Sequence, residues 1–196
     1  MKTILDNKRW VVFYSRTGQE IVDISTRLDR VPDVIVTNID PNTVSEDILN
    51  LNVPIYMLPD RPSTDQYFSA IGLDAENTIV TLHGWLRVVP KEICEQYEIY
   101  NGHPGLITKH PELKGFNPQE KAFNLGHFTI GSVVHRVTPE VDEGEILSVT
   151  ETTLDEKSRS ADLYYDVLRE TSLNSWYTFL RHGKRIDSES IPEMTV

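Results

Sequence analysis

Three side chains in this sequence have the chemistry of a proton-transfer site. Asn101 and His103 follow a short apolar run, and Asp142 lies thirty-nine residues beyond the histidine, within Val141–Gly144. Histidine exchanges protons near neutral pH, and an asparagine amide can donate a hydrogen bond to an oxygen that becomes negative in a tetrahedral intermediate. Asp142 supplies a carboxylate if the fold returns it to the histidine.

Each of these residues also has a purely structural explanation. Most histidines are structural or exposed, an asparagine after a strand can cap a loop, and Asp142-Glu143-Gly144 is ordinary turn chemistry. His135 alternates with Val134 and Arg136 on an expected strand and is as easily a satisfied core histidine. The position of His103 after a strand, between two glycines, favours the catalytic interpretation.

The elements that must position these residues alternate between strand and helix. Five runs rich in β-forming residues predict buried strands at residues 10–14, 33–37, 53–58, 78–82 and 98–101. Helices are expected between them at residues 19–28, 45–49, 63–71 and 90–94. This alternation predicts a mainly parallel α/β sheet, in which ligands bind beyond the carboxyl ends of the strands. Asn101 and His103 stand at such an end.

The rest of the chain is expected to return Asp142 to that edge of the sheet. Residues 104–118 are predicted to form a long irregular loop, and such loops are uncommon unless they are functional. The elements expected after it are a helix at 120–125, strands at 132–137 and 145–149 joined by a tight loop at Asp142-Glu143-Gly144, and a long amphipathic helix at 160–181. Gly183 is the expected helix cap, the tail from about residue 184 to Val196 is expected to be loose, and residues 1–196 are expected to form a single domain.

Composition limits the function classes. The chain has 196 residues and a net charge of −11, which argues against a broad contact surface for nucleic acid. No apolar run approaches the roughly 18 residues that a membrane helix needs, and the N-terminus lacks a signal-peptide core. The single cysteine, Cys94, excludes an internal disulfide framework and is expected to be a small buried hydrophobe in a cytoplasmic protein.

Several common site motifs are missing from the sequence. His110 and His127 fall in loops without an HExxH or CxxC pattern, so no metal site is expected. The GxGxxG fingerprint of dinucleotide-binding proteins is absent, and Ser15 and Ser132 lack the nucleophile elbow of α/β-hydrolases. Gly18 precedes a helix whose N-terminus can hold an anion, although the same loop is equally a tight strand-to-helix turn.

Four short motifs together resemble the 10-formyltetrahydrofolate-dependent formyltransferases. They are Asn101-x-His103-Pro104-Gly105-Leu106-Ile107, Lys114-Gly115-Phe116-Asn117-Pro118, Gly131-Ser132-Val133-Val134-His135 and Val141-Asp142-Glu143-Gly144. The resemblance implies a Rossmann-like α/β fold and an Asn–His–Asp catalytic set, which falls on Asn101, His103 and Asp142. In length and layout the chain is similar to the single-domain glycinamide ribonucleotide (phosphoribosylglycinamide) formyltransferase branch.

The resemblance also implies binding residues. For the pterin of the formyl donor, 10-formyltetrahydrofolate, they are Trp85, Leu86, Arg87, Val89, Val137, Thr138 and Val141. For the acceptor they are Thr17, Gly18, Gln19, Glu20, Pro104 and Glu170, with residues 17–20 at the phosphate and Glu170 at the ribose hydroxyls. The usual Gly-Ser-Asn of the phosphate loop is replaced by Gly18-Gln19-Glu20, and a carboxylate at Glu20 repels phosphate unless it points away.

The reaction implied is formyl transfer to the primary amine of a small molecule, with glycinamide ribonucleotide of purine synthesis as the first acceptor. A nucleotide-sugar amine stays open, because the Lys-Gly-x-x-Pro element is closer to the sugar, tRNA and deformylase branches. A tRNA acceptor and formyltetrahydrofolate hydrolysis are disfavoured by the acidic charge and the length of the chain. A non-catalytic folate- or nucleotide-binding module is the alternative from another class. Neither nucleic acid nor a membrane is expected as a partner, and a homodimer stays open.

Overall fold

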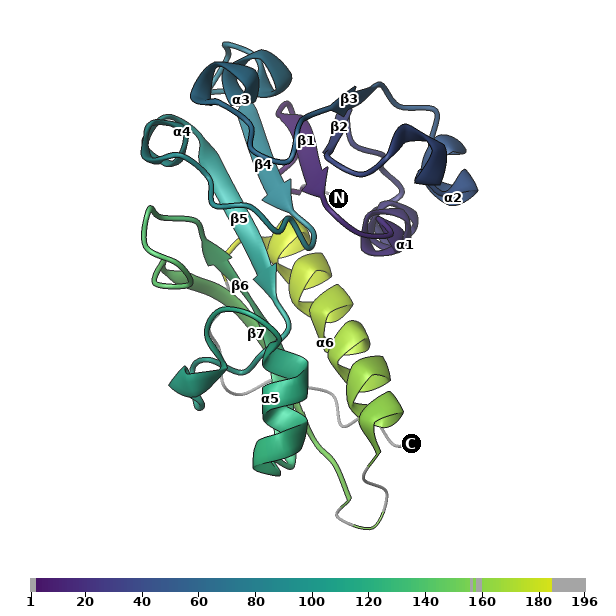
Figure 1. Ribbon diagram of the computed structural model, residues 1–196, viewed down its shortest axis with the longest axis vertical. Helices are drawn as coiled ribbons and strands as arrows, with labels where there is room; N and C mark the ends of the chain where they lie inside the picture. The colour runs from purple at the N-terminus through teal and green to yellow at the C-terminus, as the bar shows by residue number, and fades with distance from the viewer. Residues whose placement is uncertain (1–2, 156, 158–159, 185–196) are drawn as a thin grey trace.

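The protein is built on one seven-stranded mixed sheet (Figure 1). The structure, a computed structural model, describes residues 3–155, 157 and 160–184, and the predicted loose tail lies outside them. The strands are β1 (Arg9–Tyr14), β2 (Val34–Thr37), β3 (Ile55–Met57), β4 (Thr78–Leu82), β5 (Glu98–His103), β6 (Thr129–Arg136) and β7 (Ile146–Thr153). Their order is β3-β2-β1-β4-β5-β6-β7, with parallel pairing from β3 to β5 and antiparallel pairing from β5 to β7. The predicted mainly parallel sheet with an antiparallel C-terminal strand pair is confirmed.

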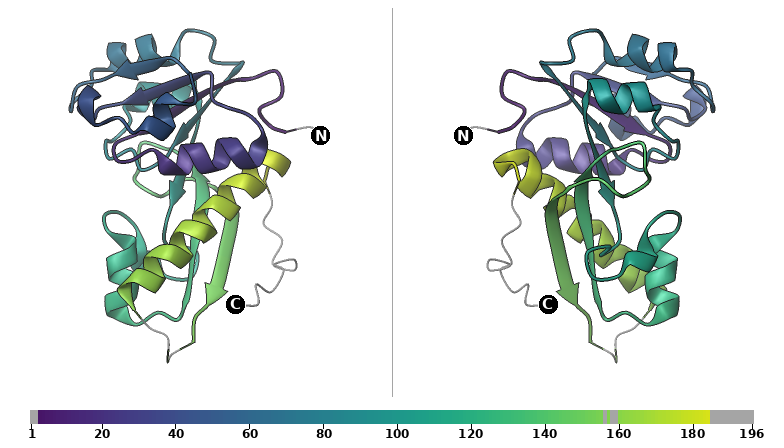
Figure 2. Two further views of the ribbon diagram at one scale, coloured as in Figure 1. Left: turned by 90° about the vertical axis from the view of Figure 1, so that its right-hand side faces the viewer. Right: turned by 90° about the vertical axis from the view of Figure 1, so that its left-hand side faces the viewer.

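Helices lie on both faces of this sheet (Figures 1 and 2). The helices are α1 (Gln19–Leu28), α2 (Glu46–Leu49), α3 (Thr64–Ile71), α4 (Lys91–Gln96), α5 (Pro118–Leu125) and α6 (Ala161–His182), with short 3₁₀ turns η1 (Pro41–Thr43) and η2 (Pro111–Leu113). Helices α1 and α6 pack on one face of the parallel strands, and α3 and α4 pack on the other. The long final helix predicted by the amphipathic pattern is therefore present and covers the sheet.

The β1 strand shows why a continuous apolar run predicts a central strand. Trp10, Val12 and Tyr14 point to the cluster formed with α1 and α6. Val11 and Phe13 point to the opposite cluster, formed with α3 and α4. Successive side chains of a strand alternate between the two faces, so a strand covered on both sides needs apolar residues at every position.

A third apolar cluster extends the sheet at the antiparallel end. It contains residues of β6, α5 and the first half of α6, and residues from the loop after β5: Ile107, Leu113, Ala122, Ile130, Val133, Tyr164 and Leu168. Figure 2 shows this part of the molecule as an extension below the parallel strands. Because the loop after β5 contributes Ile107 and Leu113 to this cluster, its path is fixed by buried contacts.

Two boundaries that matter for the site differ from those predicted. Strand β5 continues through His103 rather than ending at Asn101, because Gly102 and His103 pair with β6. Residues 137–145 separate β6 from β7, so the prediction of a tight loop at Asp142–Gly144 is wrong. Asp142 itself has a left-handed backbone conformation with φ of 56°, which asparagine and aspartate tolerate better than most residues.

Two expectations from composition can be compared with the structure. Cys94 is 6% exposed and its Sγ contacts the Val89 carbonyl, while burial raises the pKa of the thiol. It is therefore the small buried hydrophobe that was expected, rather than a reactive thiolate. Within the described residues, no helix combines the length and apolarity needed to cross a membrane.

Candidate active site

Strand pairing between β5 and β6 defines the floor of the candidate site. Asn101 lies opposite His135, and His103 lies opposite Val133. Gly102 between them is required by packing, since a Cβ at this position would lie 2.3 Å from Nε1 of the buried Trp176 on α6. In the Asn-Gly-His spacing, the two polar residues alternate with Gly102. The absence of a side chain at Gly102 lets α6 pack closely against β5 at this position.

His103 is only 4% exposed, and both ring nitrogens have neighbours. Its Nε2 lies 2.9 Å from the Leu113 carbonyl, which can only accept, so Nε2 carries the proton in this contact. Its Nδ1 lies 3.4 Å from Oδ2 of Asp142. Burial lowers the pKa of His103 below its ordinary value, and the Asp142 carboxylate and the Leu113 carbonyl oppose that shift only in part. The imidazole is therefore neutral near neutral pH, with Nδ1 free to accept a proton.

Asp142 contacts both histidines although it comes from the long loop between β6 and β7. Its Oδ1 lies 3.3 Å from Nε2 of His135, and its Oδ2 accepts a hydrogen bond from the Gly115 backbone N–H at 2.8 Å. Burial alone would raise the pKa of this carboxyl, but the contacts with His135, His103 and Gly115 outweigh burial and lower the pKa to about 2. Asp142 is therefore a buried, ionised carboxylate.

His135, which by sequence is as easily a core histidine, lies beside both Asn101 and Asp142. Its Nδ1 donates to the Arg136 carbonyl at 2.9 Å, and its Nε2 lies 3.1 Å from the Asn101 amide Nδ2 and 3.3 Å from Asp142 Oδ1. The contact with His135 fixes the orientation of the Asn101 amide. His135 is the last residue of the Gly-Ser-Val-Val-His motif, so the sequence marked it as a candidate. Only the β5–β6 register shows that it lies opposite Asn101.

The loop after β5 completes the site with backbone groups that no residue pattern predicts. Leu113 supplies its carbonyl to His103, and Gly115 supplies its N–H to Asp142. Gly115 has φ of 80°, a conformation that glycine adopts at little cost. The long loop after β5 therefore helps to fix the positions of both His103 and Asp142.

The ionised Asp142 makes the stability of the fold depend on pH. Its pKa is about 2 in the folded chain against 3.8 for the free group. A carboxyl whose pKa is lower in the folded chain than in the unfolded chain stabilises the fold at pH values above the unfolded pKa. For Asp142 this adds about 2 kcal/mol to the free energy of unfolding, and it is lost as the pH falls from about 4 to about 2. Urea unfolding at a series of pH values is expected to show Asp142→Asn less stable than the wild type at neutral pH, with a difference that vanishes in strong acid. A difference independent of pH would contradict the ionised state.

The residues expected to line the pterin pocket divide into buried and exposed groups. Trp85 and Val89 are buried in the core cluster on the α3–α4 face, so only their backbone groups can reach a ligand. Arg87 bonds to Asp60 through its side chain, at 2.8 Å to the carboxylate. Leu86 and Val141 are exposed, with 43% and 59% of their surface accessible. Val137 and Thr138 lie between β6 and Asp142, where Val137 N–H bonds to the Ile99 carbonyl at 2.9 Å.

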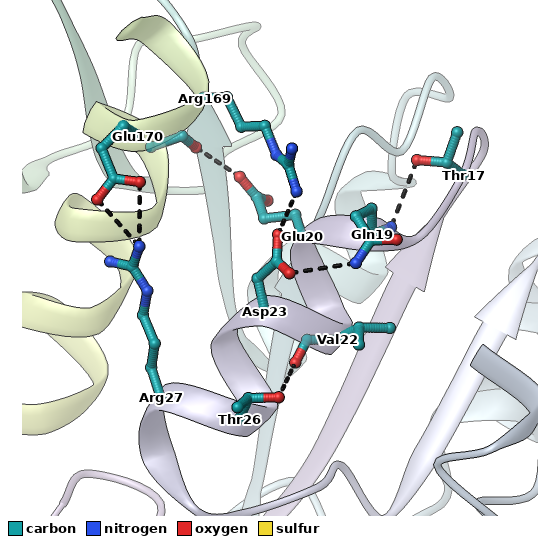
Figure 3. Close-up of polar contacts among 10 residues, drawn as sticks. Thr17, Gln19, Glu20, Val22, Asp23, Thr26, Arg27, Arg169 and Glu170 are labelled. Carbon is teal, nitrogen blue, oxygen red and sulfur yellow. Dashed lines mark hydrogen bonds and ion pairs between the residues drawn. The ribbon is translucent and has the colours of Figure 1, made fainter. Parts of the chain in front are cut away.

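The expected phosphate-binding residues 17–20 lie at the N-terminus of α1 (Figure 3). Gly18 has φ of 72° and begins the helix without a side-chain cap, while Thr17 accepts from the Gln19 N–H. Glu20 turns towards the sheet and α6, where one oxygen lies 2.7 Å from His83 Nδ1 and the other accepts from Ser172 Oγ at 2.6 Å. The carboxylate is thus held by two partners instead of projecting from the loop.

Glu170, expected at the ribose hydroxyls of the acceptor, lies on α6 and, among the described residues, makes no hydrogen bond or ion pair with Asn101, His103 or Asp142. It faces α1 and pairs with Arg27 through two contacts of 2.9 and 3.0 Å, beside a second pair between Arg169 and Asp23 (Figure 3). These pairs lie along an open hollow of about 510 Å³ between α1 and α6. Pro104, in contrast, directly follows His103 and is half-buried at the site.

The chain is similar in sequence to proteins of one known family. The sequence profile of the family described as Formyl transferase matches residues 43–177, more than half of the chain. The chain is 25% identical over 149 residues to methionyl-tRNA formyltransferase of Bacillus cytotoxicus, covering 75% of this chain and 46% of the relative. It is 30% identical over 105 residues to methionyl-tRNA formyltransferase of Phenylobacterium zucineum, covering 53% of this chain and 32% of that relative. The chain therefore spans about half the length of the curated relatives it matches.

Solved structures show the same fold over most of this chain. Glycinamide ribonucleotide transformylase 1 from Geobacillus kaustophilus matches with a TM-score of 0.73 and 25% identity, covering 89% of this chain and 97% of that one. Phosphoribosylglycinamide formyltransferase from Bacillus halodurans matches with a TM-score of 0.74 and 22% identity, over 88% and 93%. A formyltetrahydrofolate deformylase from Pseudomonas syringae matches with a TM-score of 0.67 and 21% identity, over 89% and 61%. By its profile match and its fold, this chain belongs to the formyl transferase family.

Proposed function

We propose that this chain transfers a formyl group from 10-formyltetrahydrofolate to the primary amine of a small molecule. The observation that carries the proposal is the convergence of Asn101, His103 and Asp142 at the carboxyl end of β5, with one nitrogen of His103 directed at the aspartate. These are the residues that the family resemblance assigns to catalysis. Their arrangement provides a hydrogen-bond donor, a neutral base and a fixed negative charge within one site.

The surroundings of this site fit a flat, largely apolar donor such as a pterin. Leu86, Phe116 and Val141 remain exposed on the three loops that flank the site, after β4, after β5 and after β6. Large exposed apolar side chains beside convergent polar groups are typical of a ligand site. When bound, 10-formyltetrahydrofolate supplies the formyl group on a nitrogen that becomes the leaving group.

Asn101 is the residue placed to stabilise negative charge on the formyl oxygen. Its amide has N–H groups that can donate, and the contact with His135 holds the amide in one orientation. As the lone pair of the amine forms its bond to the formyl carbon, the C=O electrons move onto oxygen, which needs a donor already in place. A preorganised donor of this kind contributes about 3 kcal/mol of transition-state stabilisation.

His103 is the residue placed to take the proton that the attacking amine must lose. The neutral ring offers the lone pair of Nδ1, since Nε2 is held by the Leu113 carbonyl. Once Nδ1 is protonated, the imidazolium is stabilised by the ionised Asp142 at 3.4 Å. The proton then passes to the leaving nitrogen as its bond to the formyl carbon breaks, which restores neutral His103 for the next turnover.

Glycinamide ribonucleotide is the first acceptor to test. The solved structures that match most of the chain include several glycinamide ribonucleotide formyltransferases. The uncapped N-terminus of α1 at Gly18 can hold a phosphate group, and the Glu20 carboxylate is held away by His83 and Ser172. The proposed role of Glu170 at ribose hydroxyls requires that a ligand compete with Arg27 for its carboxylate.

A folate-release assay with a panel of amines tests this proposal. The purified chain is incubated with 10-formyltetrahydrofolate and, separately, glycinamide ribonucleotide, a nucleotide-sugar amine, methionyl-tRNA or no amine. We expect folate release that depends on glycinamide ribonucleotide, with formylated product of equal amount. Folate release with a different amine would identify that amine as the acceptor, and folate release without any amine would indicate hydrolysis of the donor. Donor binding without release in any arm would contradict the proposed reaction and support a binding module.

A further inference from the structure

A cluster of three metal-ligating side chains lies outside the active site. His110 is the residue before η2, Glu112 lies within η2, and His127 follows the C-terminus of α5. Their ligating atoms lie within 4.8 Å of one another. The His110 and His127 rings stack with centroids 3.7 Å apart, and Glu112 Oε1 lies 3.0 Å from His127 Nε2 and 3.6 Å from His110 Nδ1.

We infer that His110, Glu112 and His127 bind a divalent transition metal, with Zn²⁺ as the best-fitting ion. Two imidazoles and one carboxylate are ligands that zinc uses in proteins, leaving a fourth position for water. Bonds of about 2.0–2.1 Å in a tetrahedral arrangement place neighbouring ligand atoms about 3.3 Å apart. The observed separations of 3.0 and 3.6 Å lie on either side of that value.

Hydrogen bonds of the backbone hold both histidines of the cluster in place. The His110 N–H bonds to the Leu106 carbonyl at 2.9 Å, and the His110 carbonyl accepts from the Leu113 N–H at 2.9 Å. The His127 N–H bonds to the Ala122 carbonyl at 3.1 Å, and its carbonyl accepts from Tyr164 of α6 at 2.5 Å. The two histidines are about a quarter exposed or less at their side chains, so an ion reaches them from solvent without opening the core.

The position of this cluster gives the metal a consequence for the active site. Glu112 directly precedes Leu113, whose carbonyl holds His103, and Gly115 of the same loop holds Asp142. An ion that joins η2 to the end of α5 restrains the segment between these contacts. The proposed metal is therefore structural, and it lowers the mobility of the loop that positions the catalytic histidine and aspartate.

The test measures metal binding directly on the full chain without a histidine tag. After treatment with EDTA and its removal, Zn²⁺ is titrated against a fluorescent chelator, and Co²⁺ is added in a parallel sample to record its visible absorption. We expect one Zn²⁺ per chain, an intense Co²⁺ spectrum of a four-coordinate site, and a higher unfolding temperature with Zn²⁺. Mg²⁺ is expected not to compete, because it prefers oxygen ligands.

Three variants make this result specific to the cluster. His127→Gln and Glu112→Gln are each expected to lower Zn²⁺ affinity by at least about 100-fold, since even the loss of an outer partner costs 10- to 100-fold. His182→Gln is the matched control, because His182 is an exposed histidine of α6 outside the cluster. Absence of Zn²⁺ binding by the wild-type chain, or equal binding by the wild type and both cluster variants, would overturn the assignment. The exposed Glu112 variant keeps the test decisive if His127→Gln does not fold.

Discussion

Replacing His103 by glutamine is expected to lower kcat for formyl transfer by about a thousandfold, within the usual contribution of acid–base catalysis. A glutamine amide can still donate to the Leu113 carbonyl but cannot accept a proton in place of Nδ1. The fold is therefore expected to persist while proton transfer is lost. The measurement is folate release under saturating donor and acceptor, together with urea unfolding of the same preparation.

The pH profile of kcat/KM provides a second readout for His103. Burial lowers its pKa, so the neutral, proton-accepting form persists below the ordinary titration range of histidine. Activity of the wild type is expected to fall only at a pH below about 6.5, where His103 becomes protonated. The control is His182→Gln, which removes an exposed histidine and is expected to leave kcat unchanged. Retention of kcat within a few-fold in His103→Gln would show that this ring is not the catalytic base.

Replacing Gly144 by alanine is expected to have the largest effect on stability, about 3 kcal/mol or more, at the upper end of overpacking costs. A Cβ at Gly144 would lie 1.7 Å from the Arg136 carbonyl oxygen, which is backbone and cannot rotate away. The same carbonyl accepts from His135 Nδ1 and so orients the ring that contacts Asn101 and Asp142. A shift of the Arg136 carbonyl therefore disturbs both the candidate active site and the loop between β6 and β7.

Urea unfolding and folate release test this prediction on one protein preparation. We expect a lower unfolding midpoint and, under conditions where the variant is folded, a kcat reduced by about tenfold or more. The matched control is Glu143→Ala, which changes the neighbouring residue and removes only an exposed ion pair with Lys114, worth less than about 1 kcal/mol. Wild-type stability in Gly144→Ala would mean that the loop does not approach β6 as closely as the structure shows.

Local patterns in the sequence were sufficient for most of the fold. The boundaries of α1 and β4 agree with the prediction, because helix amphipathicity and runs of buried β-formers are recorded within a few neighbouring residues. Helix α3 begins one residue after its predicted start, because Ser63 is its N-cap and forms a reciprocal capping box with Gln66. The prediction of a tight loop at Asp142–Gly144 was wrong. Turn residues indicate where a chain bends, but they do not indicate where the strands on either side end.

The sequence by itself also determined the family and its candidate catalytic set, because short motifs around Asn101, His103 and Asp142 carry that information without a structure. Only the tertiary structure placed His135 against Asn101 and turned Glu20 towards His83 and Ser172. These contacts join residues 34, 63 and 152 positions apart in the chain. Strand register and helix packing bring such groups together, and local sequence does not encode either one, so the electrostatics of the site emerged only from the folded chain.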